Sequence, residues 1–329
     1  MVFGATEGVG HGMEFVRIKK PGLLTTVQDL GRPNYRKYGV SVSGVMDQYS
    51  FRIANLLVGN KENEAGLEVT LIGPTLEFTE DVFFTITGAN LTPSLNNVEI
   101  PMWSVVRAKE GDILRFGQCV YGCRAYIAFS GGIDVPEVMD SKSTFLIGNY
   151  GGFKGRALAK DDVLTLKDPV YNIPYRRLRS IDIPDFAVKR KVRFIGGPHE
   201  NEFESHSVDT FLTTAYTLSN SSDRMGYRLE GEVLQHKRQA DIFSDFIAVG
   251  TIQVPGSGLP IIHMADCGTS GGYTKMGVVI SCDIPYVAQL KPGDQINFEK
   301  VSVEKALDEM YKMEEFIKQI KLNNRLFIN

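Results

Sequence analysis

The chain has 329 residues, of which 43% are hydrophobic, and its formal net charge at pH 7 is −3. At roughly 150 residues per domain, this length predicts two domains, each large enough for its own core. The slightly acidic balance excludes the basic surface of a nucleic-acid-binding protein. The lack of a long apolar run excludes a helix of the roughly 20 residues that cross a membrane.

The N-terminal residues 1–13 are rich in glycine, and they contain neither the basic region nor the apolar stretch of a signal peptide. We therefore interpret them as a tail or disordered segment. The chain has four cysteines, a number that fits a reducing compartment. Cys119 and Cys123 have too few companion ligands for zinc, so we predict a cytoplasmic protein without a metal site.

Most segments have the pattern of short strands bounded by glycine or proline, which predicts an all-β fold with few helices. The predicted strands are 83–87, 124–129, 191–195, 246–254, 260–264, 277–281 and 286–290.

Helices are predicted at 46–58, at 203–213 and from Val303 onward, where apolar residues follow helical spacing. We expect the last helix to pack on the outside of the second domain. Residues 169–185 contain three prolines and five charged residues, which is typical of a linker.

Several segments recur in the same order in the two halves of the chain. The pairs are 41–47 with 219–226, 66–74 with 253–260, and 109–116 with 291–298, with a weaker relative at 160–166. Such halves indicate two related domains from a duplication, and their interface is a natural place for a shared site. The alternative is that Gly-Asp turns recur in any all-β protein.

We place the first domain at residues 14–185, including the linker, and the second at residues 186–329, including the C-terminal helix. Neither contains a known catalytic signature: the phosphate loop, H-E-x-x-H and G-x-S-x-G are all absent from the sequence. The glycine-rich run 148–156 could contact an anion through backbone N–H groups or could be a flexible loop. His263 is interpreted as a packed or surface residue of a strand.

Polar residues gather on three glycine-containing turns, at 28–32, 222–228 and 266–275. Loops of this kind can approach a ligand closely because they lack bulky side chains. Arg224 and Arg228 are four residues apart, and a planar guanidinium suits a carboxylate or phosphate. Each Asp–Arg pair on these turns could equally be an internal salt bridge.

The segment 21–32, Pro-Gly-Leu-Leu-Thr-Thr-Val-Gln-Asp-Leu-Gly-Arg, resembles the opening of the KipA-type family, also called allophanate hydrolase subunit 2-like or the 5-oxoprolinase C subunit family. This family is related to biotin-dependent carboxyltransferases. Later blocks resemble it in the same order, over about Val16 to Phe298: they are 43–47, 54–60, 67–71, 222–226 and 271–273.

The resemblance implies two cyclophilin-like β-barrel domains. It also implies a KipI-type subunit and a LamB/YcsF-type subunit as partners in an ATP-dependent 5-oxoprolinase, which opens the lactam of 5-oxoproline to glutamate. We expect the chain to be inactive alone. One alternative is a carboxyltransferase component that moves a carboxyl group from carboxybiotin, carried on a separate protein, to urea or a related amide. Another is a regulatory protein that antagonises a KipI-type kinase inhibitor.

Under the oxoprolinase hypothesis, Arg224 and Arg228 hold the substrate carboxylate or a phosphate, Asp223 or Asp47 orients them or binds Mg²⁺, and Asp266 and Tyr273 relay a proton. We assign substrate contacts to Gln28, Asp29, Arg32, Ser43, Asp47, Gln253, Thr269, Gly271 and Gly272. We expect Arg224→Ala to abolish activity of the complex while preserving the fold.

The chain departs from the family in one loop. The family usually has Gln before Thr and then Thr-Gly-Gly-Tyr-Pro, whereas Gly268, Ser270 and Thr274 stand here. Because of this departure, the sequence does not identify the substrate.

Overall fold

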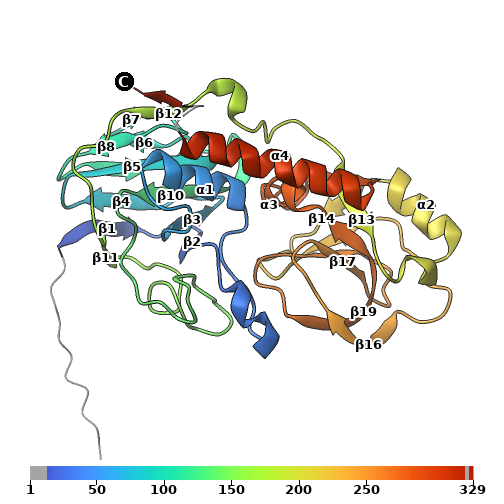
Figure 1. Ribbon diagram of the computed structural model, residues 1–329. Helices are drawn as coiled ribbons and strands as arrows, with labels where there is room; N and C mark the ends of the chain where they lie inside the picture. Colours follow the sequence, from blue (N-terminus) through green and yellow to red (C-terminus); the bar gives the residue numbers. More distant parts are fainter. Residues whose placement is uncertain (1–12, 323–325, 329) are drawn as a thin grey trace, which may run out of the picture.

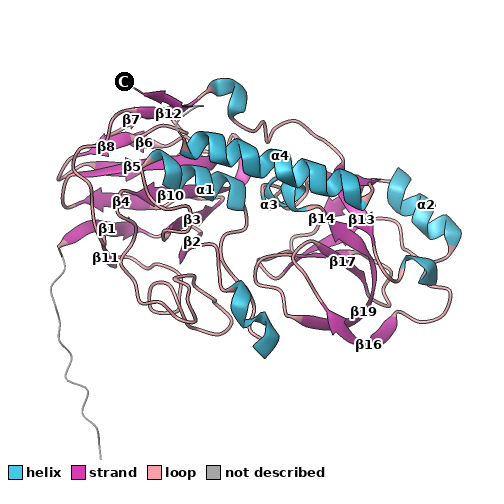
Figure 2. Cartoon of the chain, in the orientation of Figure 1, coloured by secondary structure: helices cyan, strands magenta, loops and turns pink. Residues whose placement is uncertain are grey.

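The computed structural model describes residues 13–322 and 326–328. The chain is mostly β and forms two lobes, with a long C-terminal helix lying across both (Figure 1). Figure 2 shows that strands build the body of each lobe. The predicted mainly β fold with a C-terminal helix is confirmed, while nearly all of the predicted tail lies outside the described residues.

The first half of the chain contains two antiparallel sheets. The six-stranded sheet has the order β11 (Val163–Thr165), β1 (Glu14–Lys20), β4 (Thr75–Phe78), β9 (Ile113–Arg115), β6 (Ser94–Leu95), β7 (Val98–Glu99). The five-stranded sheet has the order β2 (Leu24–Gln28), β3 (Gly66–Thr70), β10 (Tyr121–Phe129), β5 (Val82–Asn90), β8 (Val106–Ala108).

The second half forms one nine-stranded sheet that nearly closes into a barrel. Its order is β20 (Gln295–Ile296), β14 (Tyr216–Leu218), β15 (Gly226–Glu230), β18 (Ile261–His263), β17 (Thr251–Val254), β19 (Ser270–Val279), β13 (Val192–Gly196), β21 (Phe298–Lys300), with β16 (Asp241–Phe246) paired to β19. Only β13 and β21 run parallel among these described strands.

Four α-helices and four short 3-10 helices occur in the described residues. They are α1 (Gln48–Leu57), α2 (Ser205–Thr213), α3 (Ile284–Ala288), α4 (Val303–Lys321), η1 (Pro33–Tyr38), η2 (Ser180–Asp182), η3 (Glu200–Glu202) and η4 (Ser281–Asp283). Asp47 starts α1 because its carboxylate accepts the backbone N–H of Ser50 over 2.9 Å, and Ser302 caps α4 in the same way through Lys305.

Two sequence-based predictions of local structure are wrong. The predicted strand 286–290 overlaps the buried helix α3, which begins with Pro285 in its first turn, a position proline favours. The predicted loop 266–275 instead enters β19 at Ser270, since Gly271 and Tyr273 pair with β16 despite the glycines.

The recurring Gly-Asp segments form the same turn three times, ahead of β9, β20 and β11. In each copy an aspartate carboxylate accepts a hydrogen bond of 2.7–3.0 Å from the backbone N–H three residues earlier; the pairs are Lys109–Asp112, Lys291–Asp294 and Ala159–Asp162. The residue before the aspartate has a positive φ of 69° to 89°. The shared sequence pattern therefore encodes a shared turn that begins a strand.

Helix α4 packs on the first half of the chain as well as on the second, which corrects the expectation that it lies only on the second domain. Ile317 and Ile320 are buried with Ile53 and Leu57 of α1. Arg52 of α1 donates two hydrogen bonds, of 2.6 and 2.7 Å, to the Glu314 carboxylate. The helix thus ties the two halves together (Figure 1).

The predicted linker is partly ordered. Residues 176–178 form strand β12 (Arg176–Leu178), which pairs with the C-terminal strand β22 (Leu326–Ile328). One hydrophobic core lies within residues 15–166 and a second lies within residues 192–298, with Met46 as the one contribution from the first half. These separate cores support our proposal of domains at 14–185 and 186–329.

Candidate functional site

A buried ion network joins the two halves of the chain. Arg224, which precedes β15, donates from Nε to Asp266 Oδ2 over 2.9 Å and from Nη2 to Asp266 Oδ1 over 3.0 Å. Its Nη1 donates to Glu68 of β3, and its Nη2 also donates to the Gly44 carbonyl over 2.5 Å. All three charged side chains are buried. The guanidinium of Arg224 is therefore already occupied by groups of this chain.

A second part of the network surrounds Asp47 and Gln289. Gln289 donates to Asp47 Oδ2 over 2.8 Å, and its Oε1 accepts the backbone N–H groups of Cys123 and Arg124, each over 3.0 Å. Burial raises the pKa of Asp47 to about 6, although hydrogen bonds from Ser50 and Gln289 favour the carboxylate. These contacts give Asp47 a structural role between the halves, as well as its cap on α1.

A cavity of about 510 Å³ opens on the second half, beside β15, β17, β18 and β19. Six of the predicted site residues line it: Asp223, Arg228, Gln253, Gly271, Gly272 and Tyr273. Met225, Ile247 and Ile261 add apolar surface. A cavity of this size with a few convergent polar groups is typical of a small-molecule site.

Gln253 and His263 form a hydrogen-bonded pair in the cavity. Gln253 Nε2 donates to the Tyr273 carbonyl over 3.2 Å, so its Oε1 faces His263 Nε2 at 2.7 Å. In this arrangement His263 Nε2 carries the proton and Nδ1 is left as an acceptor. Burial, together with the nearby charges of Lys275 and Arg228, lowers the pKa of His263 to about 4, so this imidazole is neutral at pH 7.

Gly271 allows this pair to form. A Cβ at residue 271 would lie 2.9 Å from Gln253 Nε2 and 2.5 Å from Ile247 Cδ1. Any larger residue would displace the amide that holds His263. Asp223, at the cavity edge, uses Oδ1 to accept the backbone N–H groups of Met225 over 2.8 Å and Gly226 over 3.1 Å. It fixes the turn that presents Arg228, which is exposed.

The predicted residues of the first half lie in a separate buried loop cluster. The Asp29 carboxylate accepts hydrogen bonds from Ser141 Oγ, from Ser143 Oγ and from the backbone N–H groups of Gly31 and Lys142. Gln28, Arg32 and Ser43 lie in the same cluster and are buried. Ser43 joins it to the second half, because its backbone N–H donates to the Ala265 carbonyl over 3.0 Å.

The structure thus brings six predicted residues into one cavity and distributes the others. Arg224, Asp266 and Asp47 belong to the buried network, and Thr269 lies beside the cavity, where its carbonyl accepts the Ile247 N–H over 3.0 Å. His263 and Glu68 are the residues that sequence reasoning missed. The alternation of β18 could have placed His263 on the face that carries Arg228, but Glu68 gave no local signal.

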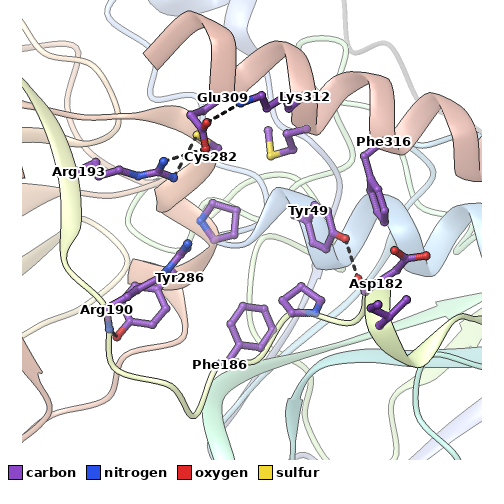
Figure 3. Close-up of a pocket in the computed structure, with 14 residues that line it drawn as sticks. Tyr49, Asp182, Phe186, Arg190, Arg193, Cys282, Tyr286, Glu309, Lys312 and Phe316 are labelled. Atoms are coloured by element: carbon purple, nitrogen blue, oxygen red, sulfur yellow. Dashed lines mark hydrogen bonds and ion pairs between the residues drawn. The ribbon is translucent and has the colours of Figure 1, made fainter. Parts of the chain in front are cut away.

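A groove of about 410 Å³ runs between the linker and helices α1, α3 and α4 (Figure 3). Figure 3 shows Arg193, Cys282 and Glu309 at one end and Tyr49 and Phe316 at the other. Arg193 donates over 2.7 Å to Asp283 and over 2.8 Å to Glu309. Because these charges are paired with one another, the groove is a weaker candidate than the cavity.

Within residues 13–322 and 326–328, no group of three or more His, Cys, Asp or Glu side chains could hold a metal ion. The same part of the chain contains no helix with the length and hydropathy needed to cross a membrane.

Comparison with known proteins identifies the family. Residues 38–300 match the family described as "Carboxyltransferase domain, subdomain A and B". The chain belongs to this family. Its members include the 5-oxoprolinase C subunits that the sequence resemblance pointed to.

Two kinds of relative are similar to the chain. The C subunit of Escherichia coli 5-oxoprolinase is 36% identical over 305 residues, which cover 93% of this chain and 97% of that protein. The urea amidolyase of Saccharomyces cerevisiae is 36% identical, but the match covers 88% of this chain and 17% of that protein. The crystal structure of Kluyveromyces lactis urea carboxylase superposes with a TM-score of 0.85 and 31% identity, over 95% of this chain and 30% of that chain.

Proposed function

We propose that this chain acts as the C subunit of a 5-oxoprolinase, a hydrolase complex that opens the lactam ring of 5-oxoproline to glutamate. The observation that carries this proposal is the match to the Escherichia coli C subunit over 97% of that protein. The match to urea amidolyase spans only a small part of a longer enzyme. Dependence on ATP, the KipI-type and LamB/YcsF-type partners, and inactivity of the isolated chain belong to the proposal.

The cavity supplies groups that suit ring opening of a lactam. A lactam is resonance-stabilised and must be polarised at its oxygen while its nitrogen is protonated. Neutral His263 offers an acceptor at Nδ1 for a water molecule, and Gln253 holds the imidazole in position. Arg228 provides a cation at the cavity opening that attracts an anionic substrate, and the Tyr273 hydroxyl offers a proton donor at the same opening.

The described residues do not fit a complete nucleotide site. The cavity lining contains a single cation, Arg228, and an acid, Asp223, whose carboxylate is engaged by backbone N–H groups. The described part of the chain also lacks a cluster of ligands for Mg²⁺. We therefore assign no nucleotide step to these residues, and we propose that ATP is bound through the partner subunits.

The test is co-expression with the genomic neighbours that encode the KipI-type and LamB/YcsF-type partners, followed by measurement of glutamate release from 5-oxoproline with and without ATP. We expect release only from the assembled complex and only with ATP. Tyr273→Phe and His263→Ala should lower this rate without loss of assembly. Assembly without glutamate release under any of these conditions would reject the proposal.

Carboxyl transfer is the second candidate, because the likeness to urea carboxylase covers 95% of this chain. In that case biotin would come from a separate protein, and the chain would transfer its carboxyl group to urea or a related amide. The two candidate functions are distinguished by adding further components to the same preparation: a biotinylated carrier, its carboxylase, ATP, bicarbonate and urea. Urea-dependent loss of labelled bicarbonate, with no glutamate formed from 5-oxoproline, would favour this candidate.

A further inference from the structure

Arg32 is a buried cation without a carboxylate partner in the described part of the chain. Only 1% of the residue is exposed, yet it makes no ion pair with any carboxylate of the described residues. Its Nη2 donates to the Ser143 carbonyl over 2.6 Å and its Nε donates weakly to Val138 over 3.4 Å. Its Nη1 has no acceptor among the described residues. A buried charge is costly unless it is paired.

The lack of a carboxylate partner for Arg32 is unusual in comparison with Arg224. Arg224 is also buried, but two carboxylates neutralise it. The nearby acids Asp29 and Asp266 attract Arg32 through space but form no ion pair with it, and the Asp29 oxygens accept four hydrogen bonds from the loop cluster. Burial lowers the pKa of Arg32, whereas the partners of Arg224 raise its pKa despite burial.

Gln28 provides a complementary buried atom next to Arg32. Its Nε2 donates to Thr26 Oγ1 and to the Thr144 carbonyl, each over 3.1 Å, while its Oε1 has no donor among the described residues. Because the Thr144 carbonyl can only accept, the amide nitrogen must face it and the orientation is fixed. Arg32 and Gln28 are therefore anchored on consecutive carbonyls, those of Ser143 and Thr144.

A glycine-rich loop, residues 148–156, lies against Arg32. The Tyr150 ring centroid lies 5.2 Å from the Arg32 guanidinium carbon. A Cβ at Gly151, where φ is +71°, would lie 3.0 Å from Arg32 Nη2 and 2.1 Å from the Ser143 oxygen. Only glycine lets the backbone approach the guanidinium this closely. The loop thus lies over Arg32, whose Nη1 has no acceptor in the described part of the chain, and Gln28 Oε1 of the same loop cluster has no donor there.

We propose that Arg32 and Gln28 form a recognition site for a small ligand that carries a carboxylate next to an N–H group. The carboxylate binds Arg32 Nη1, and the N–H donates to Gln28 Oε1. The loop 148–156 moves to admit the ligand. The inference rests on the proposed function only for the choice of 5-oxoproline, which has this pair of groups, as the first probe.

Calorimetry on the assembled complex with three probes tests the site: 5-oxoproline, pyrrolidin-2-one, which lacks the carboxylate, and tetrahydrofuran-2-carboxylate, which lacks the N–H. Wild type should bind 5-oxoproline about 10- to 100-fold more tightly than either analogue, since charge-assisted and unpaired buried groups have effects of that size. Arg32→Met should lose the preference over pyrrolidin-2-one. Gln28→Met should lose the preference over tetrahydrofuran-2-carboxylate.

Stability separates binding from a structural role. If Arg32 serves a ligand, Arg32→Met should keep or raise the melting temperature of the ligand-free protein, because it removes a buried charge that no carboxylate of the described residues contacts. Arg156→Met is the matched control in the covering loop: Arg156 pairs with Asp162 over 2.6 and 2.7 Å, and its loss should leave all three affinities unchanged. A lower melting temperature with unchanged probe preference in Arg32→Met would overturn the site.

The site and the proposed function can fail separately. Probe preferences that are equal in wild type and Arg32→Met, in a complex that releases glutamate, would overturn the site and leave the function standing. Conversely, a complex that never releases glutamate, yet binds 5-oxoproline with the preference that depends on Arg32, would support the site and reject the function.

Discussion

Arg224 and Asp266 form a bidentate ion pair at 2.9 and 3.0 Å, and Glu68 from the other half of the chain contacts the same guanidinium. This relationship changes the expectation that Arg224→Ala would preserve the fold. Because the variant leaves the buried Asp266 without its cation, and Glu68 with only the 3.9 Å contact to Arg124, we expect its free energy of unfolding to fall by about 3–5 kcal/mol. Urea denaturation measures this. Arg228→Ala, at an exposed position of strand β15, is the control and should change stability by less than about 0.5 kcal/mol; equal midpoints for the two variants would contradict the prediction.

The acid sensitivity of the fold should depend on His263. Its pKa is about 4 in the folded chain, against 6.5 as the ordinary value. The unfolded chain therefore binds a proton first as the pH falls, so stability contributed by His263 is complete above pH 6.5 and is lost toward pH 4. The loss amounts to about 3 kcal/mol. Relative to wild type, His263→Gln should gain stability over this window in denaturant titrations at successive pH values.

The titration of Asp47 should change the stability of the fold in the direction opposite to that of His263. Its folded pKa of about 6 lies above the ordinary 3.8, so the folded chain binds the proton first and stability rises as the pH falls from about 6 toward 3.8. Relative to wild type, Asp47→Asn should therefore lose stability on acidification over that range. The same titrations measure it, and a parallel pH dependence in the variant and wild type would show that Asp47 does not titrate there.

Gly271 should be required for activity while another glycine, at a surface turn, is not. Alanine at 271 would bring its Cβ within 2.9 Å of Gln253 Nε2 and would displace the amide that orients His263. We expect Gly271→Ala to lower glutamate release by the complex at least 10-fold, a loss equivalent to about 1.4 kcal/mol in the barrier. Gly256→Ala meets no atom within 4 Å and should keep full activity. If both variants are fully active, the cavity is not the reaction site.

The contact between α4 and α1 should contribute strongly to stability. Ile317 is buried against α1, whereas Leu307 of the same helix is 44% exposed. Ile317→Ala should lower the free energy of unfolding by about 2–5 kcal/mol through lost burial and a residual cavity. Leu307→Ala should cost much less. Thermal or urea unfolding of both variants makes the comparison, and a similar cost for the two would show that α4 does not bind the first half tightly.

Much of the fold could be predicted because local patterns agree with it. The strands around Phe84 and Ile127, the caps of α1 and α4, and the repeated Gly-Asp turn all follow local rules. The prediction for residues 286–290 was wrong because a short apolar run suits a buried strand as well as a buried helix. The site could be predicted only in part: residues of the second half gathered in one cavity, but the Glu68–Arg224 contact joins positions 156 residues apart, which a single sequence does not reveal.

The contacts made by the C-terminal part of the chain limit how far the two lobes can move apart. Strand β22, near the C-terminus, pairs with β12 of the segment between the two halves. Helix α4 lies across the outside of both lobes and packs on α1 of the first half. A wide separation of the two lobes would have to break three things together: the contact of α4 with α1, the β12–β22 strand pair and the buried ion network around Arg224. Small molecules can therefore reach the open cavity of the second half without such a movement, whereas the buried loop cluster around Arg32 becomes accessible only through local rearrangement of surface segments.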